Sequence, residues 1–299
     1  MLSSKTSKQK ALLALAWVCF FWGTTWLASK EAVSHNMPAL QVCAIRQLFG
    51  GTLYLLYFII TKHPWPKGKQ WGTILMLSFL NFMLSNGLST WGVQYISSGL
   101  GAIIGAIFPL WLVIIALFGG KKLPQREILG LVLGFGGVCI IFYDHLKDFL
   151  NADFRFGIII SVAATISWAI GSLYTKKHAA NFNPYFSLGL QMLISSAALF
   201  GVSGATGNTI SLADIPASSW WAIAYLVIIG SMLTFIAFIY CLQRLPTSLA
   251  SLYAYINPVV AVLLGAAIFQ EKLNIYIAIG GAVTIAGVYL VNDAFRKQA

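Results

Sequence analysis

The sequence predicts an all-α integral membrane protein with ten transmembrane helices in two inverted repeats of five. Of its 299 residues, 59% are hydrophobic and only 9% are charged, whereas soluble proteins average about 25% charged residues. The mean hydropathy is +0.80. Apolar residues form runs of roughly 18 to 23 residues, as membrane helices require, and not the alternating segments of a membrane barrel. The second half of the chain also repeats the first.

Short polar connections separate the apolar runs, so no soluble domain fits between them. The first run follows a basic tail and could be a signal peptide, but its length and its three tryptophans favour a retained helix. The four cysteines fall inside predicted helices without zinc-site spacing, which indicates packing residues. The expected spans are 11–29, 39–61, 71–94, 99–119, 127–143, 156–175, 184–204, 219–243, 248–269 and 273–292.

Basic residues are distributed unevenly between the two sides of the membrane. With a cytoplasmic N-terminus, the inner loops and tails hold fourteen Lys and Arg residues and the outer loops hold four. Cytoplasmic loops carry such an excess. We therefore expect a multi-pass protein of the plasma (inner) membrane with both termini in the cytoplasm. The net charge of +11 reflects this orientation and not nucleic-acid binding, because the basic residues form no single patch.

The two halves align at an offset of 149 residues. This alignment gives ten identities over the 43 positions from Trp71 to Val113, including Pro109 with Pro258, where chance would give roughly three. At an offset of 146, Trp22 aligns with Trp168. Residues 1–145 (spans within about 11–143) and 146–299 (about 156–292) therefore form two repeats. Since each has five spans, the second is inverted, as in many transporters.

Several motifs together resemble the EamA family of the drug/metabolite transporter superfamily. They are the segment Phe21 to Lys30, Arg46 in the second span, Pro109, Pro258, the sequence Glu271-Lys272-Leu273, Gly280 and Gly287-Val288. The resemblance covers nearly the whole chain. It implies a ten-helix basket around a central cavity lined mainly by spans 1, 3, 4, 6, 8 and 9. The first repeat has Lys121-Lys122-Leu123 where the second has Glu271-Lys272-Leu273, so a role of that glutamate occurs only once.

Aromatic residues at mid-span depth are candidates for the substrate site. Trp22 and Trp26 lie one helical turn apart on one face, and Trp168 is the repeat partner of Trp22. Tryptophan is common at membrane interfaces, but Trp22 and Trp168 fall near the centres of their spans. They line the cavity or pack between helices.

Polar residues inside the spans add a second set of candidates. Asn81 and Ser85 lie one turn apart on the third span and could contact either substrate or a neighbouring helix. Tyr253 and Asn257 form a similar pair. Pro258 cannot donate a hydrogen bond, so it frees the carbonyl near Ala254 for a ligand. We expect helix kinks at Pro109 and Pro258.

Arg46 lies about eight residues inside the outer end of its span, and no acid lies within any span core. Two interpretations remain open. Its side chain could snorkel to the outer headgroups or pair with a polar backbone site. Alternatively it could anchor a substrate carboxylate or act as a gate.

These observations predict a transporter, not an enzyme, with no cofactor and no catalytic or metal site. It would export small organic metabolites such as amino acids, aromatic or amphiphilic ones among them, by alternating access. The alternative is a related transporter of phosphorylated, nucleotide-linked or drug-like solutes. A membrane-embedded enzyme would need acids or histidines at bilayer depth, and a receptor would not need two inverted copies. We expect a small-molecule substrate, a lipid bilayer, no nucleic acid, and a monomer or weak homodimer.

Overall fold

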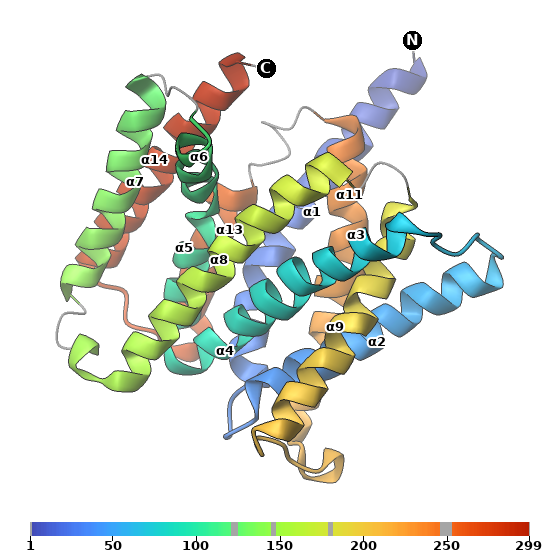
Figure 1. Ribbon diagram of the computed structural model, residues 1–299. Coiled ribbons are helices and arrows are strands. Elements are labelled where there is room, and N and C mark those ends of the chain that lie inside the picture. The colour runs from blue at the N-terminus through green and yellow to red at the C-terminus, as the bar shows by residue number, and fades with distance from the viewer. Residues whose placement is uncertain (1, 121–124, 145–147, 179–181, 246–252, 299) are drawn as a thin grey trace.

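The computed structural model describes residues 2–120, 125–144, 148–178, 182–245 and 253–298, and these residues form a bundle of tilted helices (Figure 1). Both chain ends lie at the same end of the bundle, as an even number of crossings requires. In chain order the elements are α1 (Leu2–Ala32), α2 (Ala39–Ile60), α3 (Lys69–Leu77), η1 (Ser78–Asn86), α4 (Gly87–Tyr95), α5 (Ser98–Ala106), α6 (Phe108–Phe118), α7 (Gln125–Asp144), η2 (Asp148–Leu150), α8 (Ala152–His178), α9 (Pro184–Ala205), η4 (Leu212–Asp214), α10 (Ala217–Tyr225), η5 (Leu226–Leu233), α11 (Thr234–Arg244), α13 (Tyr253–Phe269) and α14 (Ile275–Gln298).

The helices that could cross a membrane agree with the expected spans. Within the described ranges, seven are long and apolar enough by length and composition, and three shorter apolar helices cover Ile128–Ile141, Ile256–Phe269 and Ile275–Leu290. Several crossings combine successive elements, such as α3, η1 and α4. The predicted all-α membrane fold is therefore confirmed. Residues 248–252 of the ninth expected span, and Lys121 to Leu123 of the motif in the first repeat, lie outside the described residues.

Repeat-related helices form the most extensive contacts of the bundle. These pairs are α7 with α14 and α2 with α9, which lie side by side in Figure 1. Between α7 and α14 the backbones approach closely at glycines: a Cβ atom on Gly280 would lie 2.6 Å from the carbonyl oxygen of Gly137. Between α2 and α9, a Cβ atom on Gly51 would lie 2.9 Å from the carbonyl oxygen of Gly189. Small residues at such crossings let membrane helices pack without a hydrophobic driving force.

Two π-helical segments interrupt the third and eighth crossings at equivalent places. They are η1, residues 78–86, and η5, residues 226–233, and the offset of 149 residues superimposes them almost completely. A π-helix shifts the backbone hydrogen bonds to i→i+5 and leaves carbonyl groups without their usual partners. Side chains from neighbouring helices occupy some of these: Gln47 donates to Phe82 O at 3.1 Å, and Tyr54 donates to Ser231 O at 3.2 Å.

The two repeat-related prolines act differently on their helices. Pro109 follows a break at Ile107, so it occupies the first turn of α6, where a helix needs no N–H donor. Pro258 lies inside the continuous helix α13, five residues from its start. The first proline therefore begins a helix, whereas the second interrupts the hydrogen bonding of one.

Candidate functional site

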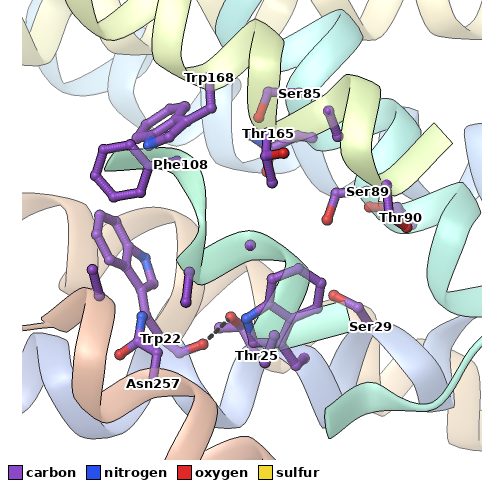
Figure 2. Close-up of a pocket in the computed structure, with 18 of the residues that line it drawn as sticks. Trp22, Thr25, Ser29, Ser85, Ser89, Thr90, Phe108, Thr165, Trp168 and Asn257 are labelled. Atoms are coloured by element: carbon purple, nitrogen blue, oxygen red, sulfur yellow. Dashed lines mark hydrogen bonds between the residues drawn. The ribbon is translucent and has the colours of Figure 1, made fainter. Parts of the chain in front are cut away.

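A cavity of about 180 Å³ lies where α1, α5, α8 and α13 meet η1, α4, α2 and α11 (Figure 2). Its lining combines aromatic rings with hydroxyl groups and contains, in the described part of the chain, a single charged side chain. The lining residues are Trp22, Thr25, Trp26, Ser29, Arg46, Ser85, Asn86, Ser89, Thr90, Ala102, Gly105, Ala106, Phe108, Ser161, Ala164, Thr165, Trp168, Phe235, Tyr253, Ala254, Asn257 and Pro258.

The cavity lies between the two repeats, because both members of several repeat-related pairs line it. Trp22 and Trp168 form one such pair. Phe108 of the first repeat aligns with Asn257 of the second. The members of this second pair occupy equivalent positions in the two repeats, but one is aromatic and the other is polar. A site at the contact of two repeats is placed where a rocking motion between them would expose it to either side of the membrane.

One end of the cavity is aromatic. Figure 2 shows Trp168 and Phe108 facing Trp22 across the space at this end. Behind Trp22, the rings of Tyr253 and Phe235 pack edge-on, with centroids 5.0 and 5.1 Å away. These contacts connect α1 to α11 and α13 and hold the indole of Trp22 in place. The edge-to-face arrangement is the one that aromatic quadrupoles favour.

The opposite end of the cavity is rich in hydroxyl groups. Ser29, Ser89 and Thr90 lie together at this end, away from Trp22 and Trp168 (Figure 2). Trp22 and Ser29 are seven residues apart on α1, which corresponds to roughly 10 Å along the helix axis. The cavity can therefore accommodate an elongated solute with one apolar and one polar end.

Trp26 covers the wall between the two ends. Its indole packs on Gly101 and Gly105 of α5, where a Cβ atom would lie 3.0 and 2.8 Å from the ring. These two glycines therefore form a close contact between α1 and α5. Only a residue without a side chain allows the indole to lie this near the helix axis.

Arg46 of α2 is the charged residue of the lining. Its side chain is 9% exposed, and its Nε donates a hydrogen bond to Ser231 Oγ on η5 at 2.9 Å. An Nη2 atom lies 3.4 Å from the point where a Cβ atom on Gly230 would be, and Thr25 adjoins the same point. Arg46 thus contacts polar groups inside the bundle and does not extend to the outer headgroups.

Asn257 of α13 contributes a polar group near the aromatic end (Figure 2). The orientation of the Asn257 side-chain amide follows from the two backbone carbonyl groups beside it, because these can only accept hydrogen bonds. The nitrogen donates to Cys19 O at 2.7 Å and to Tyr253 O at 3.0 Å. Asn257 therefore ties α13 to α1 and lines the cavity at the same time.

Asn81 and Pro109 are the two sequence candidates that do not line the cavity. Asn81 faces α8, where its side chain lies against Gly171. The reason is the close packing of α8 on η1, where the missing side chain of Gly171 leaves the space that Asn81 fills. The other candidates, Trp22, Trp26, Ser85, Trp168, Tyr253, Asn257, Arg46 and Pro258, all contact the cavity.

Two charged residues hold the connection between α4 and α5, at the end of the bundle opposite the termini. Lys30 at the end of α1 donates to Val93 O and Ile96 O, at 2.7 and 2.8 Å. Glu271 accepts hydrogen bonds from the first N–H groups of α5. The cation thus lies at a helix C-terminus and the carboxylate at a helix N-terminus, as the helix dipoles favour. The sequence gives no local sign of this contact, which we call the outer clamp.

The family model described as the EamA-like transporter family matches residues 9–143 and 155–293. The chain belongs to the EamA-like transporter family. As a member of this family it is a membrane transporter of the drug/metabolite transporter superfamily.

Bacterial transporters align with the chain over most of its length. The uncharacterized transporter YvbV of Bacillus subtilis (strain 168) is 25% identical over 292 residues, covering 97% of this chain and 94% of YvbV. The uncharacterized inner membrane transporter YedA of Escherichia coli (strain K12) is 28% identical over 263 residues, covering 87% and 83%. A solved crystal structure with 16% sequence identity superimposes with a TM-score of 0.64 over 96% of this chain and 97% of that chain, so it shares the fold.

Proposed function

We propose that this transporter exports small organic metabolites, amino acids among them, by alternating access through the central cavity. The observation that carries the proposal is the cavity between the two repeats, lined by both members of the Trp22/Trp168 pair. Rocking of one repeat against the other would open such a site to each side in turn. The residues that bind substrate in this proposal are those that line the cavity.

The size of the cavity supports a small solute. Its volume is about 180 Å³, slightly more than the roughly 150 Å³ of an engineered cavity that holds benzene. One aromatic ring with a short polar chain fits such a space. Nucleotide-linked or large drug-like solutes need several times this volume. We therefore favour amino-acid-sized metabolites over these alternatives.

We further propose that both termini face the cytoplasm of a plasma (inner) membrane. The two ends lie on the same side of the bundle (Figure 1). In the sequence, the loops and tails expected on that side hold fourteen basic residues and the loops expected on the other side hold four, which supports the orientation. The hydroxyl-rich end of the cavity and the outer clamp would then face outward. One chain contains the whole cavity, so a monomer or weak homodimer is sufficient for transport.

The experiment that tests the proposal compares the metabolites released by cells that produce the wild-type protein or a blocked variant. Ala164→Trp places an indole in the cavity lining. Ile159→Trp on the same helix is the matched control, because Ile159 is 65% exposed on the outside of the bundle. We expect wild-type and Ile159→Trp cells to release the same metabolites, and Ala164→Trp cells to retain them. Equal release by all three would contradict transport through this cavity.

A further inference from the structure

We infer that the cavity selects aromatic carboxylates, that Arg46 binds their carboxylate, and that an α-amino group on the solute weakens binding. This inference rests on the proposed function and names the substrate class of the same cavity. It follows from three features of the site: an uncompensated cation, the position of that cation, and the separation of the apolar and polar ends.

The first feature is the missing counterion of Arg46. A guanidinium group has five N–H donors, and the contact with Ser231 uses the one on Nε. Among the described residues we find no acceptor for its terminal amino groups and no carboxylate in the cavity lining. The carboxylate of Glu271 is already bound at the start of α5. Burying a cation without an anionic partner is energetically costly. A bound ligand could provide the carboxylate that would pair with Arg46.

The second feature is where the free amino groups of Arg46 lie. The Nη2 atom and the methyl carbon of Thr25 adjoin the same point above Gly230, at 3.4 and 3.0 Å. Thr25 is one helical turn from Trp22 on α1, and its hydroxyl donates to Trp22 O at 2.6 Å (Figure 2). The guanidinium group therefore lies next to α1 one helical turn from Trp22, and it lines the same cavity as the aromatic rings.

The third feature is the neutral aromatic wall. Trp22, Phe108 and Trp168 offer ring faces that stack on a planar group. Asn257 Oδ1 nearby can accept one hydrogen bond from a donor on that group. Arginine and carboxylate groups make paired, charge-assisted hydrogen bonds of defined geometry. The combination suits a flat ring with a short chain that ends in a carboxylate.

The net charge of the ligand distinguishes aromatic acids from aromatic amino acids in their binding beside Arg46. A monoanion neutralises Arg46, whereas a zwitterion leaves the cavity with a net positive charge. The ammonium group of an α-amino acid is one carbon from its carboxylate, so it would be held close to the guanidinium group. In a medium of low dielectric constant this repulsion is strong. Only neutral oxygens of the lining, such as Asn257 Oδ1, could offset it.

Four ligands of one shape test the inference with purified wild-type protein in detergent: 3-phenylpropanoate, phenylalanine, 3-phenylpropanamide and phenylalanine amide. They carry an anion, a zwitterion, no charge and a cation on the same ring and chain length. Dissociation constants are measured by calorimetry. We expect 3-phenylpropanoate to bind at least about tenfold more tightly than phenylalanine, which corresponds to about 1.4 kcal/mol. The neutral amide and the cation should bind more weakly still.

Variants assign the preference to Arg46. Arg46→Gln should reduce the affinity for 3-phenylpropanoate at least about tenfold and leave the affinity for the neutral amide unchanged. Arg46→Lys keeps the charge and should keep part of the preference. Ser231→Ala is the matched control, because it removes the hydrogen-bond partner of Nε without removing the cation. Each variant is compared at equal monodispersity in detergent.

Three results would overturn the inference: equal binding of the anion and the neutral amide, tighter binding of phenylalanine than of 3-phenylpropanoate, or an anion preference that survives Arg46→Gln. Failure of all four ligands to bind would also overturn it, since they represent the class named. The proposed transport function would stand in each case, provided that cells with the wild-type protein release metabolites that Ala164→Trp cells retain.

Discussion

The carboxylate of Glu271 accepts two hydrogen bonds from Ser98, although 173 residues separate them in the chain. The backbone N–H of Ser98 donates at 2.7 Å and its hydroxyl group at 2.8 Å. The backbone N–H of Gly99 adds a third contact at 3.2 Å. Gly265 provides the space, because a Cβ atom there would lie 2.5 Å from the carboxylate. The end of the ninth crossing in the second repeat is thus fixed to the start of the fourth crossing in the first.

Weakening this contact should make the cavity more accessible from the outer side. Glu271→Gln removes the charge that favours the helix N-terminus, and a hydrogen bond to a charged group contributes about 1.5–3 kcal/mol. The reporter is Ala106→Cys in the cavity lining, in a protein whose four native cysteines have been replaced. We expect an impermeant thiol reagent, added outside intact cells, to label this cysteine several-fold faster when Glu271→Gln is present.

The matched control for this measurement is Glu31→Gln, which removes a carboxylate from the same end of α1 that carries Lys30. Its labelling rate should equal that of the parent. Equal rates for Glu271→Gln and the parent would show that the contact does not restrict access from outside.

The positions of the membrane helices follow from the sequence because the bilayer imposes length and polarity on each crossing separately. The expected spans 39–61 and 184–204 differ by one residue from α2 and α9. Long-range contacts leave no such local mark. Glu271 lies at a span end, where a charged residue needs no explanation, and only folding brings it to Ser98.

The cavity lining was predictable where depth within a span decides it and not where helix packing decides it. Trp22, Trp168 and Asn257 lie at mid-span depth and all line the cavity. Asn81 does not, because its side chain lies against Gly171 of α8, and the sequence of η1 alone does not show which helix packs there. For Arg46, the interpretation as a snorkelling residue is wrong, since its Nε contacts Ser231 inside the bundle.

Substitutions at two adjacent glycines of α7 should separate the effect of packing against α14 from the effect of helix propensity. A Cβ atom on Gly137 would collide with the backbone of Thr284, whereas one on Gly136 meets nothing within 4 Å. We expect Gly137→Ala to destabilise the protein by about 1–3 kcal/mol through overpacking. Gly136→Ala should stabilise it by about 0.5–1 kcal/mol, because alanine favours a helix. Thermal unfolding in detergent measures both, and similar melting temperatures for the two variants would exclude the close crossing.

Cysteine labelling tests the proposed orientation. Single cysteines at Asn36, Asp148 and Thr209 should react with an impermeant reagent in intact cells, because these positions connect crossings on the side opposite the termini. A cysteine at Lys67, between α2 and α3, should react only after the membrane is opened. Labelling of position 67 in intact cells would contradict the ten-span topology.

Transport should depend on membrane potential and not on a proton gradient. Among the residues that the structure describes, no lining residue of the cavity is acidic, and an obligate proton carrier normally needs such a group at membrane depth. An exported anion moves negative charge outward, which an inside-negative potential favours by about 2.3 kcal/mol per 100 mV. In proteoliposomes loaded with 3-phenylpropanoate, an imposed inside-negative potential should accelerate efflux. A pH gradient should change efflux only as much as it does in protein-free liposomes, through which the protonated acid diffuses. Many-fold accumulation driven by a pH gradient, beyond that of protein-free liposomes, would refute this prediction.

Substitutions around Trp22 should affect substrate binding and leave the conformational change of the transport cycle nearly unchanged. Trp22→Ala or Tyr253→Ala removes a ring from the aromatic end, so the half-saturation concentration should rise several-fold with little change in maximal rate. Trp221→Ala is the control, because Trp221 is 77% exposed on the outside of the bundle.

Asn257 and Pro258 should give different defects from the rings. Asn257→Leu removes the Oδ1 acceptor and should relax selectivity between substrates with and without a donor on the ring. It also removes the contact of α13 with Cys19 O, so its melting temperature must be compared with that of the parent.

Pro258→Ala restores an N–H donor inside α13. A straighter, stiffer helix should slow turnover while the dissociation constant stays nearly constant, because the proline acts on the moving helix and not on the ligand. If well-folded variants at all four positions bind and transport like the parent, the substrate does not occupy this cavity and these side chains serve helix packing alone.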